Sequence, residues 1–380
     1  MERTCFEPMA VQCRQAAESR AHSATSHKTD AITQHVMVGV TVHLDIPFRT
    51  VSDRTSAFDN VVAYASHIVS TLNEGFNNTT PEFLRWSNMS AQDIMLESGM
   101  TMYKSQKLYD QLNDPVVGTS DMFFVLRGVH YNSSQTQAII VDPRNGANVR
   151  ALKVGRWPRD PATMNVWVTT LGQDILGFAT FPFTSEPRET YGVVVDYRST
   201  HPSLGFTEYG LNRTIVHEVG HCFGLFHTFT DPNAPLPSAH MTDDNDEVGE
   251  RNGDGIKDTP RQAFPTFGNT LLTSSSDADI AFVNTMNYTQ DASSLGFTKE
   301  QVERMRYFLQ HDVQDYITDM TLTDEPPTAG ASSVAVVDQA LNHDDTSKSN
   351  IRWQITSIIF IVLSVALAIV LAYIVTRNKN

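Results

Sequence analysis

Three histidines and a glutamate stand close together in the stretch His217–His227, which reads H-E-x-x-H-x-x-G-x-x-H. On a helix, His217 and His221 lie four residues apart and therefore on one face, where two neutral imidazoles can bind one zinc ion. Gly224 can end the helix because glycine adopts positive φ without a Cβ clash, and the chain can then bring His227 in as a third ligand. Three protein ligands leave one position for water, which is typical of a catalytic zinc.

Glu218 follows the first of these histidines and is the expected general base. Zinc lowers the pKa of its water toward about 7 and polarises a carbonyl, so Glu218 would take the proton of that water and pass it to a leaving amine. The pattern therefore predicts zinc-dependent hydrolysis of peptide bonds in protein substrates.

Two alternatives compete with this interpretation. One is a catalytically inactive, membrane-anchored binding or scaffold protein on the same fold, against which the intact Glu218 argues. The other is a closed structural zinc site, which needs a fourth ligand. Cys222 is the nearby thiol, but one position after His221 it points away from the face that carries the two helical histidines.

A sheet and two helices are expected to position this stretch. Alternating apolar residues predict a strand at Val36–Leu44, and helical spacing predicts a helix at Val61–Phe76, before which Ser56 and Asp59 form a candidate capping box. Further strands are expected at Met122–Leu126, Met164–Thr169, Gly177–Phe181 and Gly192–Asp196. This order predicts an α/β fold with a twisted, mostly parallel sheet, a backing helix and a zinc-binding helix.

The expected catalytic domain covers residues 33–318, with an upper subdomain at 33–227 and a smaller lower subdomain at 228–318. Within it, 77–120 reads as an insertion with helical parts. Near its end, Thr298 and Gln301 form a capping box before an apolar stripe, which predicts a C-terminal helix packed under the domain.

Over roughly residues 33–318 the chain resembles the pappalysin (cytophagalysin) family of metzincin metalloproteases. The long histidine motif and a methionine turn, here N-T-M-N-Y at 284–288, are shared by all metzincins. The stretches G-D-G-I-K-D-T-P at 253–260 and F-T-x-x-Q-x-x-R-M at 297–305 indicate this family. The disulfide cysteines usual in the C-terminal half of its members are missing here.

The resemblance implies further site residues. Met286 would form an apolar floor beneath the metal, and Tyr288 would stabilise the oxyanion, unless it is merely a packed tyrosine. In metzincins an antiparallel edge strand lines the cleft and can bind an extended peptide as an added strand. By its order along the chain, this strand corresponds to Gly177, Phe178, Ala179, Thr180 and Phe181. The alternative is an ordinary edge strand ended by Pro182.

The acidic stretch from Asp243 to Asp258 offers oxygen ligands of the kind that calcium prefers, although it lacks EF-hand spacing. The resemblance implies calcium near this region, and Asp254 and Asp258 are the best candidates. The alternative is a solvated acidic loop.

Composition limits the partners and the compartment. With Lys+Arg 28 against Asp+Glu 43, the formal net charge is −15, which argues against a nucleic-acid partner because phosphates need a basic face. Three cysteines cannot build a disulfide framework. Residues 1–32 contain no signal-peptide pattern and are expected to be disordered or a pro-segment. Cys5 or Cys13 is a candidate thiolate that blocks the zinc, the alternative being an incidental cysteine in a flexible tail.

After a linker at 319–350, residues 351–376 are expected to form a transmembrane helix, followed by a short tail at 377–380. About 21 consecutive uncharged, mostly apolar residues from Ile355 are enough to span a ~30 Å hydrocarbon core, and Trp353 and Tyr373 lie where interfacial aromatics belong. We therefore expect a single-pass, C-terminally anchored membrane protein of the tail-anchor type. Basic residues flank both ends, so the side on which the catalytic domain lies stays open.

Overall fold

The computed structural model describes residues 4–5, 35–113, 120–157, 159–172, 175–184, 186–229, 254–259, 262, 264–269, 283–321 and 334–339. One compact unit comprises Met1–Tyr131 and Gln135–Val337; Asn132–Ser134 and Asp338–Asn380 belong to a second. The candidate site lies wholly within the first unit.

The strands form one sheet in the described part of the chain, in the order β1-β6-β7-β5-β2-β3-β9, with β4 beside β5 and β8 beside β2. They are β1 (Thr4–Cys5), β2 (His35–Leu44), β3 (Met122–Tyr131), β4 (Ile140–Val141), β5 (Met164–Leu171), β6 (Ile175–Ala179), β7 (Val193–Asp196), β8 (Ile317–Thr321) and β9 (Ala335–Asp338). β2 is parallel to β3 and β5, β5 is parallel to β7, and β6 is antiparallel to β7. The expected mostly parallel sheet with an antiparallel strand is confirmed; β8 adds a second antiparallel pairing, to β2.

The helix expected at Val61–Phe76 is present with these bounds as α3. The α-helices are α2 (Phe48–Ser52), α3 (Val61–Phe76), α4 (Pro81–Ser87), α5 (Ala91–Ser98), α6 (Met102–Asn113), α7 (Gly146–Arg150), α8 (Arg213–Cys222) and α9 (Lys299–His311). A π-helix, η1 (Ala151–Arg156), continues α7, and the 3-10 helices are η2 (Arg188–Thr190), η3 (Tyr197–Ser199), η4 (Pro202–Leu204), η5 (Asp291–Ser293) and η6 (Gln314–Tyr316).

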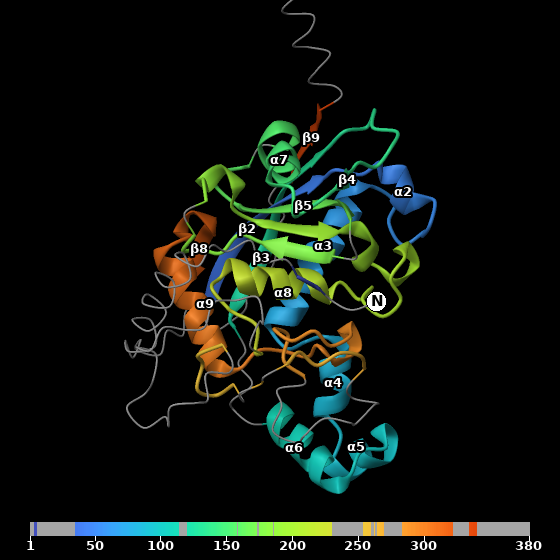
Figure 1. Ribbon diagram of the computed structural model, residues 1–380, viewed down its shortest axis with the longest axis vertical. Coiled ribbons are helices and arrows are strands. Elements are labelled where there is room, and N and C mark those ends of the chain that lie inside the picture. Colours follow the sequence, from blue (N-terminus) through green and yellow to red (C-terminus); the bar gives the residue numbers. More distant parts are fainter. Residues whose placement is uncertain are drawn as a thin grey trace, which may run out of the picture. The chain divides into compact units, whose positions relative to one another are not determined.

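The sheet is covered on both faces. Alternate residues of β2, from Val36 to Leu44, join the main core with α3 and α8. On the other face Trp167 of β5 packs with Leu152 and Trp157 from η1 and the residue after it. Figure 1 shows α3 and α8 below the strands and α7 above them. The layered architecture therefore buries α8, which carries the histidine motif, against the sheet.

The ends of two helices show that one predicted helix cap is correct and another is not. The capping box of α9 is present, since the Thr298 hydroxyl accepts from the Gln301 N–H and the Gln301 side chain accepts from the Thr298 N–H. The predicted box at Ser56 and Asp59 is wrong. α3 is instead capped by Asn60, whose Oδ1 accepts from the backbone N–H groups of Val62 and Ala63.

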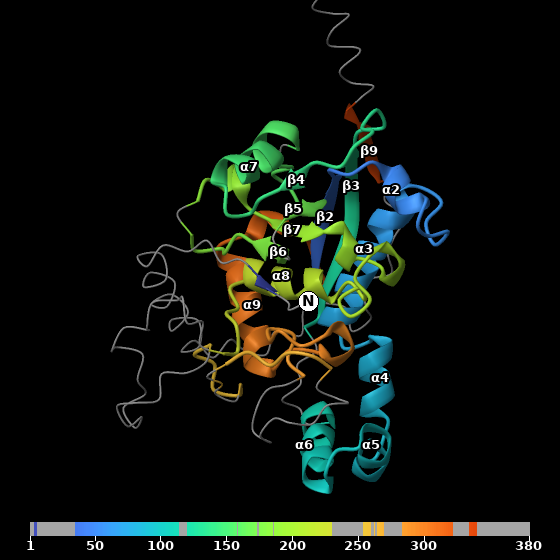
Figure 2. The same ribbon diagram turned by 45° about the vertical axis from the view of Figure 1, so that its right-hand side comes forward.

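The described part of the insertion at 77–120 contains three helices, α4 to α6, and their core around Trp86, Ile94 and Leu108 also includes Val283 and Leu295. The group projects from the end of the unit that lies opposite α7, as Figures 1 and 2 show. Its helical parts agree with the sequence expectation.

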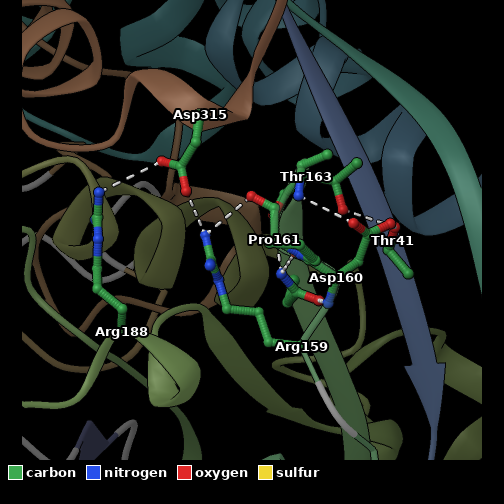
Figure 3. A network of polar contacts seen from close by, with 9 residues as sticks. Thr41, Arg159, Asp160, Pro161, Thr163, Arg188 and Asp315 are labelled. Atoms are coloured by element: carbon green, nitrogen blue, oxygen red, sulfur yellow. Dashed lines mark hydrogen bonds and ion pairs between the residues drawn. The ribbon is translucent and has the colours of Figure 1, made fainter.

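A partly buried arginine links η6 to the region before β5. Arg159 donates to a carboxylate oxygen of Asp315 at 2.6 Å, and the other oxygen of Asp315 lies 3.6 Å from Arg188 in the β6–β7 connection (Figure 3). Next to it, the Thr163 hydroxyl donates to Thr41 of β2 at 2.7 Å. These contacts join η6, the β6–β7 connection and the start of β5.

No helix among the residues described combines the length and apolar character needed to cross a bilayer. The predicted transmembrane helix at 351–376 and tail at 377–380 lie outside the described residues, as do most of 1–32 and 319–350. The domain limits and the anchor therefore stay predictions.

Candidate active site

The first part of the histidine motif lies on α8, which is buried along its whole length. The carboxylate of Asp291 fixes the start of this helix by accepting from the N–H groups of Leu211 and Arg213 at 2.9 and 3.2 Å. Beyond the end of the helix, Gly224 has φ +91°, and a Cβ there would lie 2.2 Å from a ring carbon of Phe308. Conformation and space both require glycine at this position.

The three imidazoles converge. The Nε2 atoms of His217, His221 and His227 lie 3.1–3.3 Å from one another, and all three residues are buried. The other ring nitrogens of His217 and His221 each lie 2.7 Å from a backbone carbonyl, of Thr285 and Leu225 respectively. Because a carbonyl only accepts, these Nδ1 atoms carry the proton, and the Nε2 atoms present lone pairs to one another.

This arrangement fits zinc. Unprotonated nitrogens at such distances repel one another unless a cation lies between them, and three nitrogens at about 2.0–2.1 Å from one tetrahedral zinc are about 3.3 Å apart. Burial lowers the pKa of His221 to about 4, which keeps it in the neutral form that binds metal. Within the described part of the chain, these histidines are the one group of three or more His, Cys, Asp or Glu side chains with metal-binding spacing.

Glu218 has no exposed surface and lies against β6. A Cβ on Gly177 would lie 2.8 Å from Cγ and 2.9 Å from Oε1 of Glu218. The missing side chain at Gly177 therefore lets β6 pass directly beside the carboxylate. This contact brings the expected general base next to the expected substrate strand.

The expected substrate strand is displaced by two residues from the predicted range. Gly177, Phe178 and Ala179 lie in β6, whereas Thr180 and Phe181 follow its end. Phe181 still belongs to the site, because its ring lies 5.1 Å from that of His221. β6 is not the outermost strand, since β1 pairs with it in parallel and Cys5 is opposite Gly177 in the register.

The methionine turn lies under α8. Met286 is fully buried, and a Cβ on Gly220 of α8 would lie 2.6 Å from its sulfur. The preceding carbonyl, of Thr285, is the acceptor for His217. The turn thus contacts the metal-binding face from below, in the place that the resemblance implies for Met286.

Tyr288 lies beside two of the histidines. Its ring centre is 4.8 Å from that of His227 and 6.2 Å from that of His217, and it is 9% exposed. It also contacts Phe229, which stacks on His227 at 4.7 Å and 7°. The ring of Tyr288 thus lies next to two of the metal-binding histidines, and its role as an oxyanion donor stays a prediction.

The two candidate calcium ligands have protein partners. Asp254 accepts from the Ile256 N–H and from the side chain of Gln301, and burial raises its pKa to about 6, opposed by the nearby Arg304. Asp258 accepts from the Glu300 N–H at the start of α9. The two family-like stretches therefore contact each other, and calcium binding stays a prediction.

Several site residues gave no usable signal in the sequence. Asp291, 78 residues after Arg213, holds the start of α8. Lys153 is buried behind β6, where its Nζ donates to the Thr180 hydroxyl at 3.0 Å and to the Thr190 carbonyl at 2.7 Å. An isolated aspartate and an isolated lysine usually indicate solvated positions; only the fold shows their partners.

The sequence profile of the peptidase family described as "Pregnancy-associated plasma protein-A" matches residues 156–310. This range contains the three histidines, Glu218, Met286, Tyr288 and most of α9. Residues 156–310 of this chain therefore match the pappalysin family of metzincin peptidases. β2, β3 and the helical insertion precede the matched range.

Curated proteins similar to this chain include two fungal proteins. An extracellular metalloprotease of Sordaria macrospora is 31% identical over 196 residues, which are 50% of this chain and 61% of that protein. An extracellular metalloprotease of Aspergillus fumigatus is 33% identical over 164 residues, 40% and 46% of the two chains. The matches thus span about half to three-fifths of these relatives.

A solved structure has a similar mixed α/β fold. A mutant of promirolysin from Tannerella forsythia superposes with a TM-score of 0.54 at 23% identity, covering 82% of this chain and 92% of that one. At this identity the likeness concerns the fold alone.

Proposed function

We propose that the protein is a zinc-dependent endopeptidase that hydrolyses peptide bonds of protein substrates. The observation that carries the proposal is the convergence of three imidazole Nε2 atoms, 3.1–3.3 Å apart, beside a buried glutamate that touches a strand edge. Metal ligands, a base and a peptide-binding edge are the parts that such a reaction requires.

In this proposal His217, His221 and His227 hold the metal, with Met286 as the apolar floor below. Zinc, when bound there, would act as a Lewis acid on the scissile carbonyl and lower the pKa of a water molecule. Glu218 takes the proton from the attacking water and delivers it to the leaving amine. The Tyr288 hydroxyl donates a hydrogen bond to the developing oxyanion.

The substrate backbone is expected to lie along β6 as an added strand, in the place that β1 occupies in this structure. Gly177 keeps this edge close to Glu218, and Phe181 borders His221. An extended peptide in this place has its carbonyls beside both the base and the metal ligands. The net charge of −15 is consistent with a peptide rather than a nucleic acid as substrate.

The proposal retains the membrane anchor at 351–376. The curated relatives are named extracellular metalloproteases, which favours a catalytic domain outside the cytosol. Digestion of sealed membranes from expressing cells, with and without detergent, would locate the domain.

Calcium at Asp254 and Asp258 also belongs to the proposal, and calcium retained at one ion per chain after gel filtration would support it.

The decisive experiment uses the full chain in detergent with a random peptide library, with and without a zinc chelator. Cleavage should stop with the chelator and in Glu218→Ala, while Glu218→Ala retains one zinc per chain. Glu303→Ala, an exposed position on α9, is the matched control and should leave cleavage unchanged. Zinc at one ion per chain without any cleavage would instead favour the inactive binding or scaffold protein.

A further inference from the structure

Two phenylalanines are exposed close to the candidate active site. Phe264 is 78% exposed and Phe267 is 39% exposed, although a phenylalanine side chain gains free energy from burial. The ring of Phe267 lies 6.0 Å from that of Tyr288, which in turn contacts His227. Exposed aromatic side chains that continue from a metal-binding site indicate a surface for an apolar ligand group.

The segment that carries these rings is fixed to the methionine turn. Gln262, which is buried, donates to the Phe264 carbonyl and to the Thr266 hydroxyl, and it accepts from the side chain of Asn287 at 3.0 Å. The Thr266 N–H donates to the side-chain oxygen Oδ1 of Asn287 at 2.9 Å. Asn287 is fully buried and lies between Met286 and Tyr288, so the segment is held in position by the catalytic turn itself.

A second link lies at the far end of the segment. The Gln290 N–H donates to the Gly268 carbonyl at 3.0 Å, and Gly268 forms an isolated parallel bridge with Thr289. The exposed rings therefore lie on a segment that hydrogen bonds hold in place at both ends. Such pre-organisation reduces the entropy that a ligand must overcome on binding.

Phe267 approaches the candidate site through Tyr288, on the side of His227 and His217, whereas the residues after β6 border His221. A peptide on β6 extends about 3.3 Å per residue and projects alternate side chains to opposite sides. A side chain within about three positions of the scissile bond can therefore reach the phenylalanines.

We propose that Phe264 and Phe267 form an apolar subsite that selects peptides with an aromatic or large aliphatic residue near the scissile bond. The subsite rests on the proposed function, because it describes the substrate of the same site. Burial of the substrate side chain against these exposed rings provides the selectivity, with a further contribution from offset or edge-to-face ring contacts.

The test compares two peptide series that differ only in one residue, phenylalanine or serine, at each of three positions on either side of the cleaved bond. The full-length wild type should prefer phenylalanine at one position by about tenfold in kcat/KM, as expected for one apolar contact. The double variant Phe264→Ala/Phe267→Ala should lose this preference and keep its rate on the serine peptides. Phe264→Leu/Phe267→Leu should recover it in part.

Tyr103→Ala, another exposed aromatic side chain but on α6, is the matched control and should change neither rate. An unchanged preference in the alanine double variant would overturn the subsite. An equal fall in kcat/KM on both peptide series would also overturn the subsite, because it would indicate that the two phenylalanines have only a structural role.

Binding separates this proposal from the proposed function. Calorimetry with the Glu218→Ala protein should show tighter binding of the phenylalanine peptide than of its serine partner, and the difference should vanish when both phenylalanines are also replaced. If this difference in binding is found but the wild type cleaves no peptide, the protease function is refuted and the apolar subsite is supported. If the wild type cleaves peptides but the two peptides bind equally well, the subsite is refuted and the protease function is supported.

Discussion

Gly177 of β6 and Glu218 of α8 pack closely together, since a Cβ on Gly177 would lie 2.8 Å from Cγ of Glu218 and 3.0 Å from the Val194 carbonyl oxygen. One neighbour is a buried side chain and the other is the backbone of β7. Neither can yield easily, so an added methyl group must move either β6 or the carboxylate. The position of the expected general base is thus set by the absence of a side chain on the neighbouring strand.

Gly177→Ala should therefore impair catalysis without removing the metal. We expect kcat/KM to fall about 10- to 100-fold, because a displacement of about 1 Å at a reacting group has effects of this size. Steady-state kinetics and zinc content by atomic absorption give the two readouts. Gly172→Ala is the matched control, because its Cβ would meet Ile140 at 3.5 Å, an ordinary contact. Equal activity of both variants would contradict the argument.

Tyr288→Phe tests the tyrosine hydroxyl separately from its ring. The ring contacts with His227 and Phe229 remain in this variant. If the hydroxyl stabilises the oxyanion, kcat should fall about 100-fold while KM and zinc content change little. A tyrosine that only packs would leave kcat within a factor of two or so, and that outcome would remove Tyr288 from the mechanism.

The histidine motif was readable from the sequence because its geometry is almost entirely local. A four-residue spacing on one helix and a glycine turn are enough to bring three imidazoles together. The positions of Met286 and Tyr288 came from the resemblance, not from any local rule. The capping of α3 by Asn60 was missed because Ser56 and Asp59 offered an equally good local pattern four residues earlier.

What could not be predicted depends on long-range contacts. The Gly177–Glu218 contact joins residues 41 positions apart (218 − 177), and the pairing of β1 with β6 joins still more distant ones. Lys153 reads as a surface residue until the fold places it under Trp167 and Phe178, with its Nζ 5.1 and 5.4 Å from their ring centres. The exposed Phe264 and Phe267 carried no periodic signal.

Lys153 should give the protein a measurable pH dependence of stability. Burial lowers its pKa to about 7, with Cys222 and Glu186 acting in the opposite direction, whereas a lysine in the unfolded chain titrates near 10.4. Above about pH 7 the unfolded state therefore binds more protons, so the free energy of unfolding should rise with pH, by up to about 1.4 kcal/mol per unit.

Urea unfolding between about pH 7 and 8.5 measures this slope, below the range in which Cys222, whose pKa burial raises to about 12, contributes with the opposite sign. Lys153→Met should lose the slope, and the Thr190 carbonyl would keep the Thr180 hydroxyl as donor at 3.0 Å. Lys257→Met, at an exposed lysine, should behave as the wild type. The same slope in all three proteins would show that Lys153 stays charged when folded.

The N-terminal segment should inhibit the enzyme. Thr4 and Cys5 pair with β6 opposite Ile175 and Gly177, the place where a substrate strand is expected to add. Deletion of residues 1–33 should then raise kcat/KM of the otherwise complete chain, since the substrate no longer competes with a covalently linked strand of high effective concentration.

Cys5→Ser and Cys13→Ser separate two forms of this inhibition; Cys13 lies outside the described residues. If a thiolate also blocks the metal, one serine variant should raise activity nearly as much as the deletion does. If only the strand competes, the deletion alone should raise it, through a lower KM for long peptides and little change for short ones. Equal activity of the deletion and the complete chain on long peptides would show that β1 leaves the edge of β6 accessible to substrate.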